Sequence, residues 1–244
     1  AGRSAEEFPN LPVINKENPV VLSQFTLKEV IRQTVFSISD NDNVRIMTGE
    51  LFEIKGDALR VISLDGYRVS IRRVIMNDSY DDRKVIIPGK TLNEISKILS
   101  GEVSSLVNIY FTDKHALFEF DSTIVLTRLI EGEYYRIDSM LSSDYETKVS
   151  INKKELQSSI ERASLLVRET DKSPVIIEIK DNNFELRINT QLGSMNEEID
   201  ISHEGKNITI GFNPRFLLDA LRVIDDETVD IYFINAKAPC FIKD

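Results

Sequence analysis

The segment with the clearest chemical potential is a short polar turn followed by three different binding groups. Asp65-Gly66 separates two β-prone runs, and both residue types tolerate positive φ, so the pair predicts a hairpin. Tyr67, Arg68 and Val69 follow directly. A ring, a guanidinium and an aliphatic group placed together could form one edge of a peptide-binding groove.

Residue types used in catalysis and metal binding are scarce. The two histidines, His115 and His203, are predicted to lie in turns, and neither has an evident nucleophile as a partner. Cys240 is the single cysteine, so no internal disulfide can form. The chain also lacks phosphate-loop, HExxH and CxxC patterns. We therefore expect no catalytic residue, no metal site and no cofactor.

The composition limits the classes of partner. A chain of 244 residues with 41% apolar content can form two ordinary domains. The net charge of −10 weighs against a uniformly basic nucleic-acid coat, so any DNA contact needs a local patch. No apolar run approaches the roughly 18 to 20 residues that span a bilayer. We expect no membrane partner and a cytoplasmic location.

The elements around these residues follow a repeated pattern. A short strand followed by a helix recurs about every 60 residues, and strand candidates rather than another helix follow each copy. The four helices are predicted at 26–36, 90–99, 152–166 and 213–223. The sequence thus predicts an α+β protein in which each domain packs two helices on antiparallel sheets built from a duplicated strand-helix-meander unit. Chance similarity of short strand-helix echoes is the alternative.

Two such units per domain set the expected boundaries. The first domain is predicted at 13–141, including a connector at 131–138, and the second at 142–244. Residues 6–11 resemble that connector, so residues 1–12 are expected to be a linker from a missing preceding domain. The last unit has one strand candidate fewer than its counterpart. We therefore expect the second domain to lack its last strand and the intact protein to continue beyond Asp244.

The predicted helices carry more basic than acidic residues. They contain nine Lys or Arg against five Asp or Glu. Such faces could contact DNA phosphates without reading bases, while the acidic remainder repels DNA. The alternative is that these cations are ordinary helix formers on solvated faces.

Three segments resemble one family, the bacterial DNA polymerase III beta subunits, or beta sliding clamps. Residues 63–69 (SLDGYRV) are similar to the family's T-D-G/S-H-R-L turn, residues 85–92 (VIIPGKTL) to its VIPGKSL strand-helix entry, and residues 210–221 (IGFNPRFLLDAL) to its GFNxxYLLDAL segment. The similarity runs in order over essentially the whole chain. Leu64, Tyr67 and Tyr135 depart from the family's usual Thr, His and Pro.

The resemblance implies the second and third domains of the DNA-clamp fold. In that family, two three-domain protomers close into a homodimeric ring around duplex DNA, which they bind without sequence preference. A peptide pocket docks the replicative polymerase, the clamp loader and repair proteins through short motifs. The resemblance therefore implies a non-catalytic processivity factor that acts in DNA replication.

The same resemblance assigns residues to sites. The partner-peptide pocket would use Met47, Leu64, Gly66, Tyr67, Arg68, Val69, Tyr135, Ser139, Met140, Lys237 and Pro239. The residues expected to face DNA lie on the helix faces, and Arg45 is added to them by resemblance. They are Lys28, Arg32, Arg45, Lys90, Lys97, Lys154, Arg162, Arg215 and Arg222. Leu165 and Leu166 would pack against the other protomer, although the end of a helix can also be ordinary core.

Two other functional classes stay open from the residues alone. A protein-interaction scaffold without a DNA role would suit the acidic total. A hydrolase would need acids such as Asp65 and Glu131 to act with Tyr67 or Tyr135.

Overall fold

The computed structural model describes residues 12, 14–141, 144–167 and 173–243. They form two compact units, of which the first ends at Tyr134 and the second begins at Tyr135. Most of the expected linker at 1–12, the expected boundary at 142 and residue 244 lie outside the described residues.

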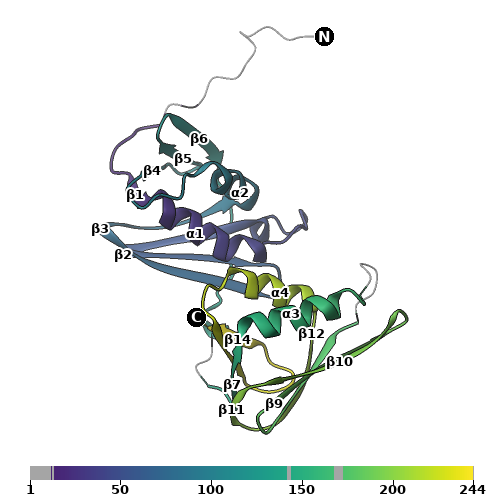
Figure 1. Ribbon diagram of the computed structural model, residues 1–244. Helices are drawn as coiled ribbons and strands as arrows, with labels where there is room; N and C mark the ends of the chain where they lie inside the picture. Colours follow the sequence, from purple (N-terminus) through teal and green to yellow (C-terminus); the bar gives the residue numbers. More distant parts are fainter. Residues whose placement is uncertain (1–11, 13, 142–143, 168–172, 244) are drawn as a thin grey trace, which may run out of the picture. The chain divides into compact units, whose positions relative to one another are not determined.

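The first unit contains two helices, and a strand leads directly into each (Figure 1). Its elements are β1 (Val20–Ser23), α1 (Gln24–Thr34), β2 (Gly49–Leu64), β3 (Val69–Pro88), α2 (Gly89–Ile98), β4 (Leu106–Phe111), β5 (His115–Phe120) and β6 (Thr123–Arg128). The strands form a sheet of order β1-β4-β5-β6 and the long β2-β3 hairpin.

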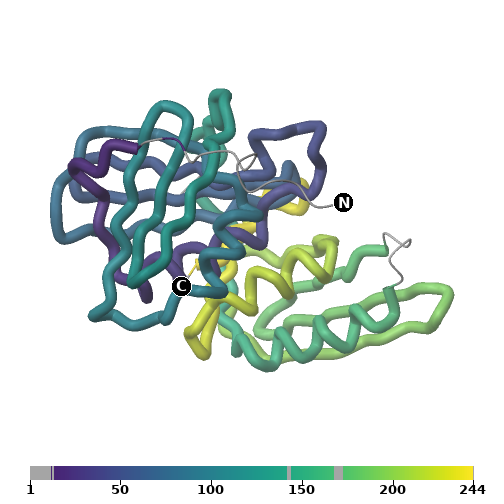
Figure 2. Tube along the Cα trace, turned by 90° about the horizontal axis from the view of Figure 1, so that it is seen from above, coloured from purple at the N-terminus to yellow at the C-terminus, as the bar shows by residue number. Residues whose placement is uncertain are grey.

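The second unit repeats the strand-helix entry twice. Its elements are β7 (Thr147–Asn152), α3 (Lys153–Ser164), β8 (Val175–Lys180), β9 (Asn183–Thr190), β10 (Gly193–Asp200), β11 (Ser202–Gly205), β12 (Ile208–Phe212), α4 (Pro214–Val223), β13 (Thr228–Phe233) and β14 (Cys240–Lys243). The sheets have the orders β10-β9-β8-β12 and β11-β7-β13-β14. In both views α3 and α4 lie side by side (Figures 1 and 2).

The two units share one rule of strand exchange. In each, the strand before one helix pairs antiparallel with the strand that follows the other helix. Thus β1 pairs with β4 and the end of β3 with the start of β2, while β7 pairs with β13 and β12 with β8. The halves of each unit are therefore interlocked. This arrangement confirms the predicted clamp fold built from a duplicated strand-helix unit.

Local chemistry explains where the helices begin. The side chains of Ser23, Asn152 and Asn213 each accept a hydrogen bond from a first-turn backbone amide of α1, α3 and α4 respectively. No side-chain hydrogen bond caps α2, which begins at the tightly packed Gly89. A Cβ there would lie 2.3 Å from Cδ1 of Ile38, so Ile38 would have to move to admit any side chain.

Each unit has its own apolar core, and the helices of each unit contribute to it. In the first, Leu27 and Ile31 of α1 and Leu92 of α2 pack with strand residues. In the second, Ile160 of α3 and Leu221 of α4 do the same. Both helix pairs also contact each other, α1 with α2 and α3 with α4. The opposite faces of the helices are left for other contacts.

The predicted placement of the histidines in turns was wrong. His115 is the first residue of β5 and pairs with Arg128, and His203 lies in β11 opposite Val149. These short polar segments form strands because their backbone groups make hydrogen bonds with a neighbouring strand. Residue type alone does not reveal such pairing.

Candidate partner-binding turn and helix faces

The turn between β2 and β3 is organised by the carboxylate of Asp65. Its Oδ1 accepts hydrogen bonds from the backbone amides of Tyr67, at 2.9 Å, and Arg68, at 3.1 Å. The amide of Asp65 in turn donates to the carbonyl of Arg68. Gly66 has a φ of +92°, whereas Asp65 does not have positive φ. The hairpin is confirmed, but only one residue of the pair needs the left-handed conformation.

The side chain of Arg68 is held at both ends of its guanidinium. Nε lies 3.0 Å from Oδ2 of Asp65, and Nη2 donates to the carbonyl of Phe36 at 2.6 Å. The guanidinium carbon also lies 5.5 Å from the centre of the Phe36 ring, within cation-π range. A charge-assisted hydrogen bond and a stacked ring thus fix a cation beside the turn.

The apolar groups of the turn differ in exposure. Tyr67 is 84% exposed and Val69 is 41% exposed, whereas Leu64 is buried. Met47, in a short 3-10 turn at 45–48, is half-buried. A large exposed ring next to a fixed guanidinium is an arrangement that hot-spot contacts commonly use.

The pocket residues expected beyond Tyr134 all belong to the second unit. Tyr135 is 45% exposed and Met140, at the end of a 3-10 turn that includes Ser139, is 59% exposed. Lys237 and Pro239 lie in a loop in which Asn235 Oδ1 accepts a hydrogen bond from the Lys237 amide at 2.8 Å. The expected pocket residues are therefore divided between the two units.

Four of the nine expected DNA-facing cations pair with acidic side chains of their own unit. Arg32 pairs with Glu29, and Lys97 pairs with Glu94. Arg162 pairs with Glu197, and Arg222 lies close to both Asp219 and Glu161. Arg45, Lys90, Lys154 and Arg215 are exposed. The helix faces are thus less positive than the count of Lys and Arg indicates.

A lysine closes the end of the neighbouring helix in both units. Nζ of Lys28, on α1, donates to the carbonyl of Leu99 at the C-terminus of α2 at 2.9 Å. Nζ of Lys153, on α3, donates in the same way to Ile224 at the C-terminus of α4 at 2.6 Å. An ammonium at a helix C-terminus satisfies an orphan carbonyl and interacts favourably with the helix dipole. Lys28, expected to face DNA, therefore also has a structural role.

Sequence reasoning missed one buried ionisable residue close to the turn. Glu50, on β2, is fully buried, and its Oε1 has no hydrogen-bond partner among the described residues. Burial raises the pKa of Glu50 to about 8, and a hydrogen bond with Thr34 opposes this in part. Nearby, Tyr134 donates to the carbonyl of Gly49, and burial followed by the charge of Glu50 raises the pKa of its phenol. The sequence signal that could have revealed this buried acid is the position of Glu50 inside an apolar segment.

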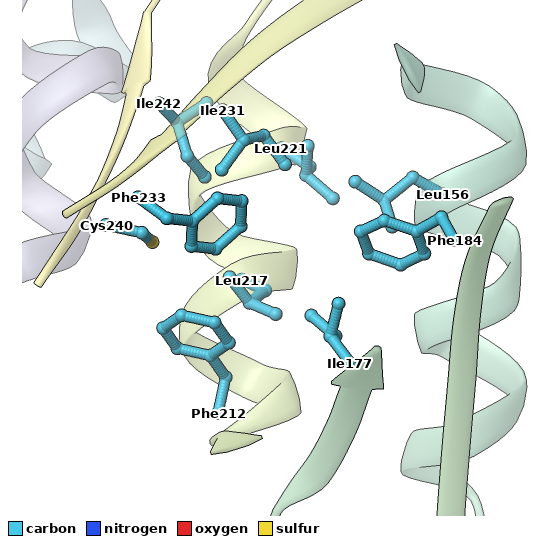
Figure 3. Close-up of a pocket in the computed structure, with 10 residues that line it drawn as sticks. All are labelled: Leu156, Ile177, Phe184, Phe212, Leu217, Leu221, Ile231, Phe233, Cys240 and Ile242. Carbon is cyan, nitrogen blue, oxygen red and sulfur yellow. The ribbon is translucent and has the colours of Figure 1, made fainter. Parts of the chain in front are cut away.

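A small apolar pocket lies in the second unit. Figure 3 shows side chains from α3, α4, β13 and β14 converging on it, including Leu156, Leu221 and Phe233. Cys240 points toward the same space, and burial raises the pKa of its thiol to about 12. The described lining has no polar side chain that could orient a reacting group, so we assign no catalytic role to this pocket.

The two leucines expected at a protomer contact behave differently. Leu165, which follows the last residue of α3, is 79% exposed. Leu166 packs against the core of its own unit. Only Leu165 thus presents a large apolar surface to solvent.

Two other kinds of feature are absent from the described residues. No cluster of His, Cys, Asp and Glu there has the arrangement of a metal site. No helix among the described residues is both long and apolar enough to cross a membrane.

Comparison with known proteins identifies the relatives of this chain. Residues 21–135 match the family described as the central domain of the DNA polymerase III beta subunit, and residues 138–244 match the family described as its C-terminal domain. Curated relatives named beta sliding clamp are 32% identical over 98% of the chain in Streptococcus pneumoniae and 31% identical over 100% in Staphylococcus aureus. The chain spans 64% and 65% of the lengths of these relatives.

Solved structures agree with this match. A crystal structure from Eubacterium rectale, assigned to the DNA polymerase III beta subunits, is 61% identical and superposes with a TM-score of 0.97, covering 100% of this chain and 66% of that one. The DNA polymerase sliding clamp from Bacillus subtilis is 32% identical with a TM-score of 0.95, covering 99% of this chain and 64% of that one. Two domain families that are consecutive parts of one protein thus account for nearly all of the sequence, and the chain belongs to the bacterial DNA polymerase III beta subunits.

Proposed function

We propose that the protein acts as a DNA sliding clamp, a non-catalytic processivity factor that encircles duplex DNA and tethers replication proteins to it. The observation that carries this proposal is the match over nearly the whole chain to relatives named beta sliding clamp. The α+β units with paired helices supply the fold that those relatives use. A clamp working on replicating DNA would act in the cytoplasm.

The turn at 65–68 is the proposed docking point for partner proteins in the first unit. Tyr67 offers an exposed ring and Val69 an exposed aliphatic group, and Arg68 adds a fixed cation between them. Short peptides with spaced aliphatic and aromatic anchors suit such a surface, because apolar anchors give affinity while one polar group sets orientation. We assign the polymerase, the clamp loader and repair proteins as the partners of this site.

Contact with DNA is proposed to be weak and independent of sequence. The exposed cations Lys90 and Lys154 lie at the starts of α2 and α3, where they can reach phosphates. The acidic partners of Lys97 and Arg162 reduce the positive charge of the same faces. Few strong phosphate contacts would favour sliding over fixed binding.

Ring closure is proposed to involve the end of α3. Leu165, directly after the last residue of α3, exposes most of its side chain to solvent. An apolar residue of this kind suits a contact with the other protomer of a homodimer.

The test is topological. The intact protein would be assembled on nicked circular DNA with its cognate loader, and retention would be followed before and after a restriction cut. We expect retention on the circle and rapid release from the cut DNA, because a ring leaves only over an end. Equal retention on both substrates would reject encirclement. Peptide binding without any DNA retention would favour a protein-interaction scaffold instead.

A further inference from the structure

The guanidinium of Arg68 is already ordered in the absence of any partner. Asp65 contacts it from within the turn, and Phe36 contacts it from the 3-10 turn at 35–37 that follows α1. Two segments 29 or more residues apart thus converge on one side chain. Arginine loses much rotamer entropy when it is fixed. If the arginine were mobile, this loss would occur on binding and would lower the affinity for the partner.

Asp65 has two separable roles in this arrangement. Oδ1 accepts the backbone amides of Tyr67 and Arg68 and so holds the turn, whereas Oδ2 lies 3.0 Å from Nε of Arg68. An asparagine at this position keeps one carbonyl oxygen for the turn but loses the charge and the second acceptor. Replacement by asparagine therefore separates turn formation from contact with Arg68.

Phe36 also contributes twice. Its carbonyl accepts from Nη2 of Arg68 at 2.6 Å, and its ring lies 5.5 Å from the guanidinium carbon. The carbonyl belongs to the backbone and survives any substitution. Leucine at position 36 would therefore remove the stacked ring alone, while it retains an apolar side chain.

We infer that Asp65 and Phe36 are positioning residues that hold the Arg68 guanidinium in its binding orientation before a partner peptide arrives. This inference rests on the proposed function of the turn as a peptide-docking point. Both residues act through Arg68, so they need no contact with the peptide. Preorganisation of one rotamer-rich side chain corresponds to about a two- to tenfold gain in affinity.

The test is a double-mutant cycle read by two measurements. Asp65→Asn, Phe36→Leu and Arg68→Ala would be made singly, and the first two would also be combined with Arg68→Ala. Binding of a fluorescein-labelled synthetic peptide with spaced Leu and Phe anchors gives Kd for each variant. Exchange of the Arg68 Nε proton with solvent, followed by NMR, reports on positioning without the peptide. Glu178→Gln, which removes the 2.8 Å partner of Arg187 in the second unit, is the matched control.

We expect Asp65→Asn and Phe36→Leu each to raise Kd about two- to tenfold, and to have no further effect in the Arg68→Ala background. Exchange at Arg68 Nε should become faster in Asp65→Asn but not in Glu178→Gln. An unchanged Kd in both single variants, or an equal loss with and without Arg68, overturns the inference. If the wild-type protein binds no peptide, the proposed docking function fails; the exchange measurement then decides the positioning of Arg68 separately.

Discussion

The hydroxyl of Thr34 lies 2.9 Å from Oε2 of the buried Glu50. The same hydroxyl lies 2.7 Å from the carbonyl oxygen of Val30, which can only accept a hydrogen bond. A hydroxyl has one proton. When Thr34 donates that proton to Val30, only a protonated Glu50 can complete the contact, as the donor. Burial raises the pKa of Glu50 to about 8, although a hydrogen bond donated by Thr34 to the carboxylate lowers it in part, and this pKa indicates a neutral carboxylic acid at pH 7.

This protonation predicts a pH-dependent stability. The pKa of Glu50 is about 8 in the folded protein against 4.5 for an ordinary glutamate. The folded state therefore holds the proton more tightly, so the contribution of Glu50 to stability is full below pH 4.5 and is lost as the pH rises through about 8. The slope from one such group cannot exceed about 1.4 kcal/mol per pH unit. Urea unfolding of the wild type and of Glu50→Gln across this range measures it.

Glu50→Gln keeps the shape and hydrogen-bonding capacity of the acid but cannot ionise. We expect the free energy of unfolding of Glu50→Gln, relative to the wild type, to rise steadily between pH 5 and about 8. Parallel pH profiles for the two proteins would contradict a protonated Glu50.

Glu53, three residues along β2, is expected to show the opposite dependence. Burial alone would raise its pKa, but the hydrogen bond from Lys84 and the charges of Arg60, Lys84 and Lys55 together lower it. Its contribution to stability is therefore present above pH 4.5 and is lost as the pH falls through the lowered value. Glu53→Gln should flatten the acid side of the unfolding profile while it leaves the alkaline side unchanged. A change on the alkaline side only would contradict this assignment.

Periodicity along the sequence predicted all four helices and the strands around them, because each helix has an apolar stripe that packs on a sheet. The strand pairing was not predictable from local pattern, since β1 pairs with β4 more than 80 residues away. One further signal of the duplication was present. Ile109-Tyr110-Phe111 of β4 and Ile231-Tyr232-Phe233 of β13 repeat the same triplet, each in the strand that follows its unit's second helix.

The β2-β3 hairpin shows where local pattern fails. The sequence indicated strands near 59–63, 67–71 and 85–87, whereas the strands extend over 49–64 and 69–88. Register shifts around Gly56 interrupt the alternation of apolar and polar residues, and much of β3 is exposed and charged. Backbone pairing, rather than burial, sustains the strand there.

The candidate sites were also predictable from the sequence only where they depend on local contacts. The turn at Asp65 and its binding groups could be identified because turn chemistry is local. The neutralised cations could be foreseen only in part. Glu94 and Lys97 lie one helical turn apart, so their pairing follows from spacing, but Arg162 and Glu197 are separated by 35 residues. Phe36 could not be connected with Arg68 without the fold.

A side chain at position 89 is expected to destabilise the protein, because Ile38 would have to move. A Cβ would lie 2.3 Å from Cδ1 of Ile38 and 3.2 Å from the carbonyl oxygen of Thr48. Gly89→Ala should therefore lower the free energy of unfolding by about 1–3 kcal/mol, as is usual for overpacking. Thermal or urea unfolding gives the value. Adding Ile38→Val, which removes the clashing Cδ1, should recover part of the loss; no recovery would place the strain at Thr48 instead.

The last prediction concerns the ion pairs on the helix faces that we propose turn toward DNA. Lys97 lies 2.6 Å from Glu94, so the acid competes with a phosphate for the same ammonium. Within the described part of the chain, no carboxylate pairs with the exposed Lys154. Each cation that contacts a phosphate adds about 0.9 to the slope of log affinity against log salt. Lys154→Gln should therefore lower this slope by about that amount in a fluorescence titration of the intact protein with a short duplex. Glu94→Gln should raise both the affinity and the slope, since it releases Lys97 for the phosphate. Lys180→Gln, an exposed lysine at the end of β8 rather than on a helix, is the control and should change neither. If the control alters the slope as much as Lys154→Gln does, the helix faces are not the surface that meets DNA.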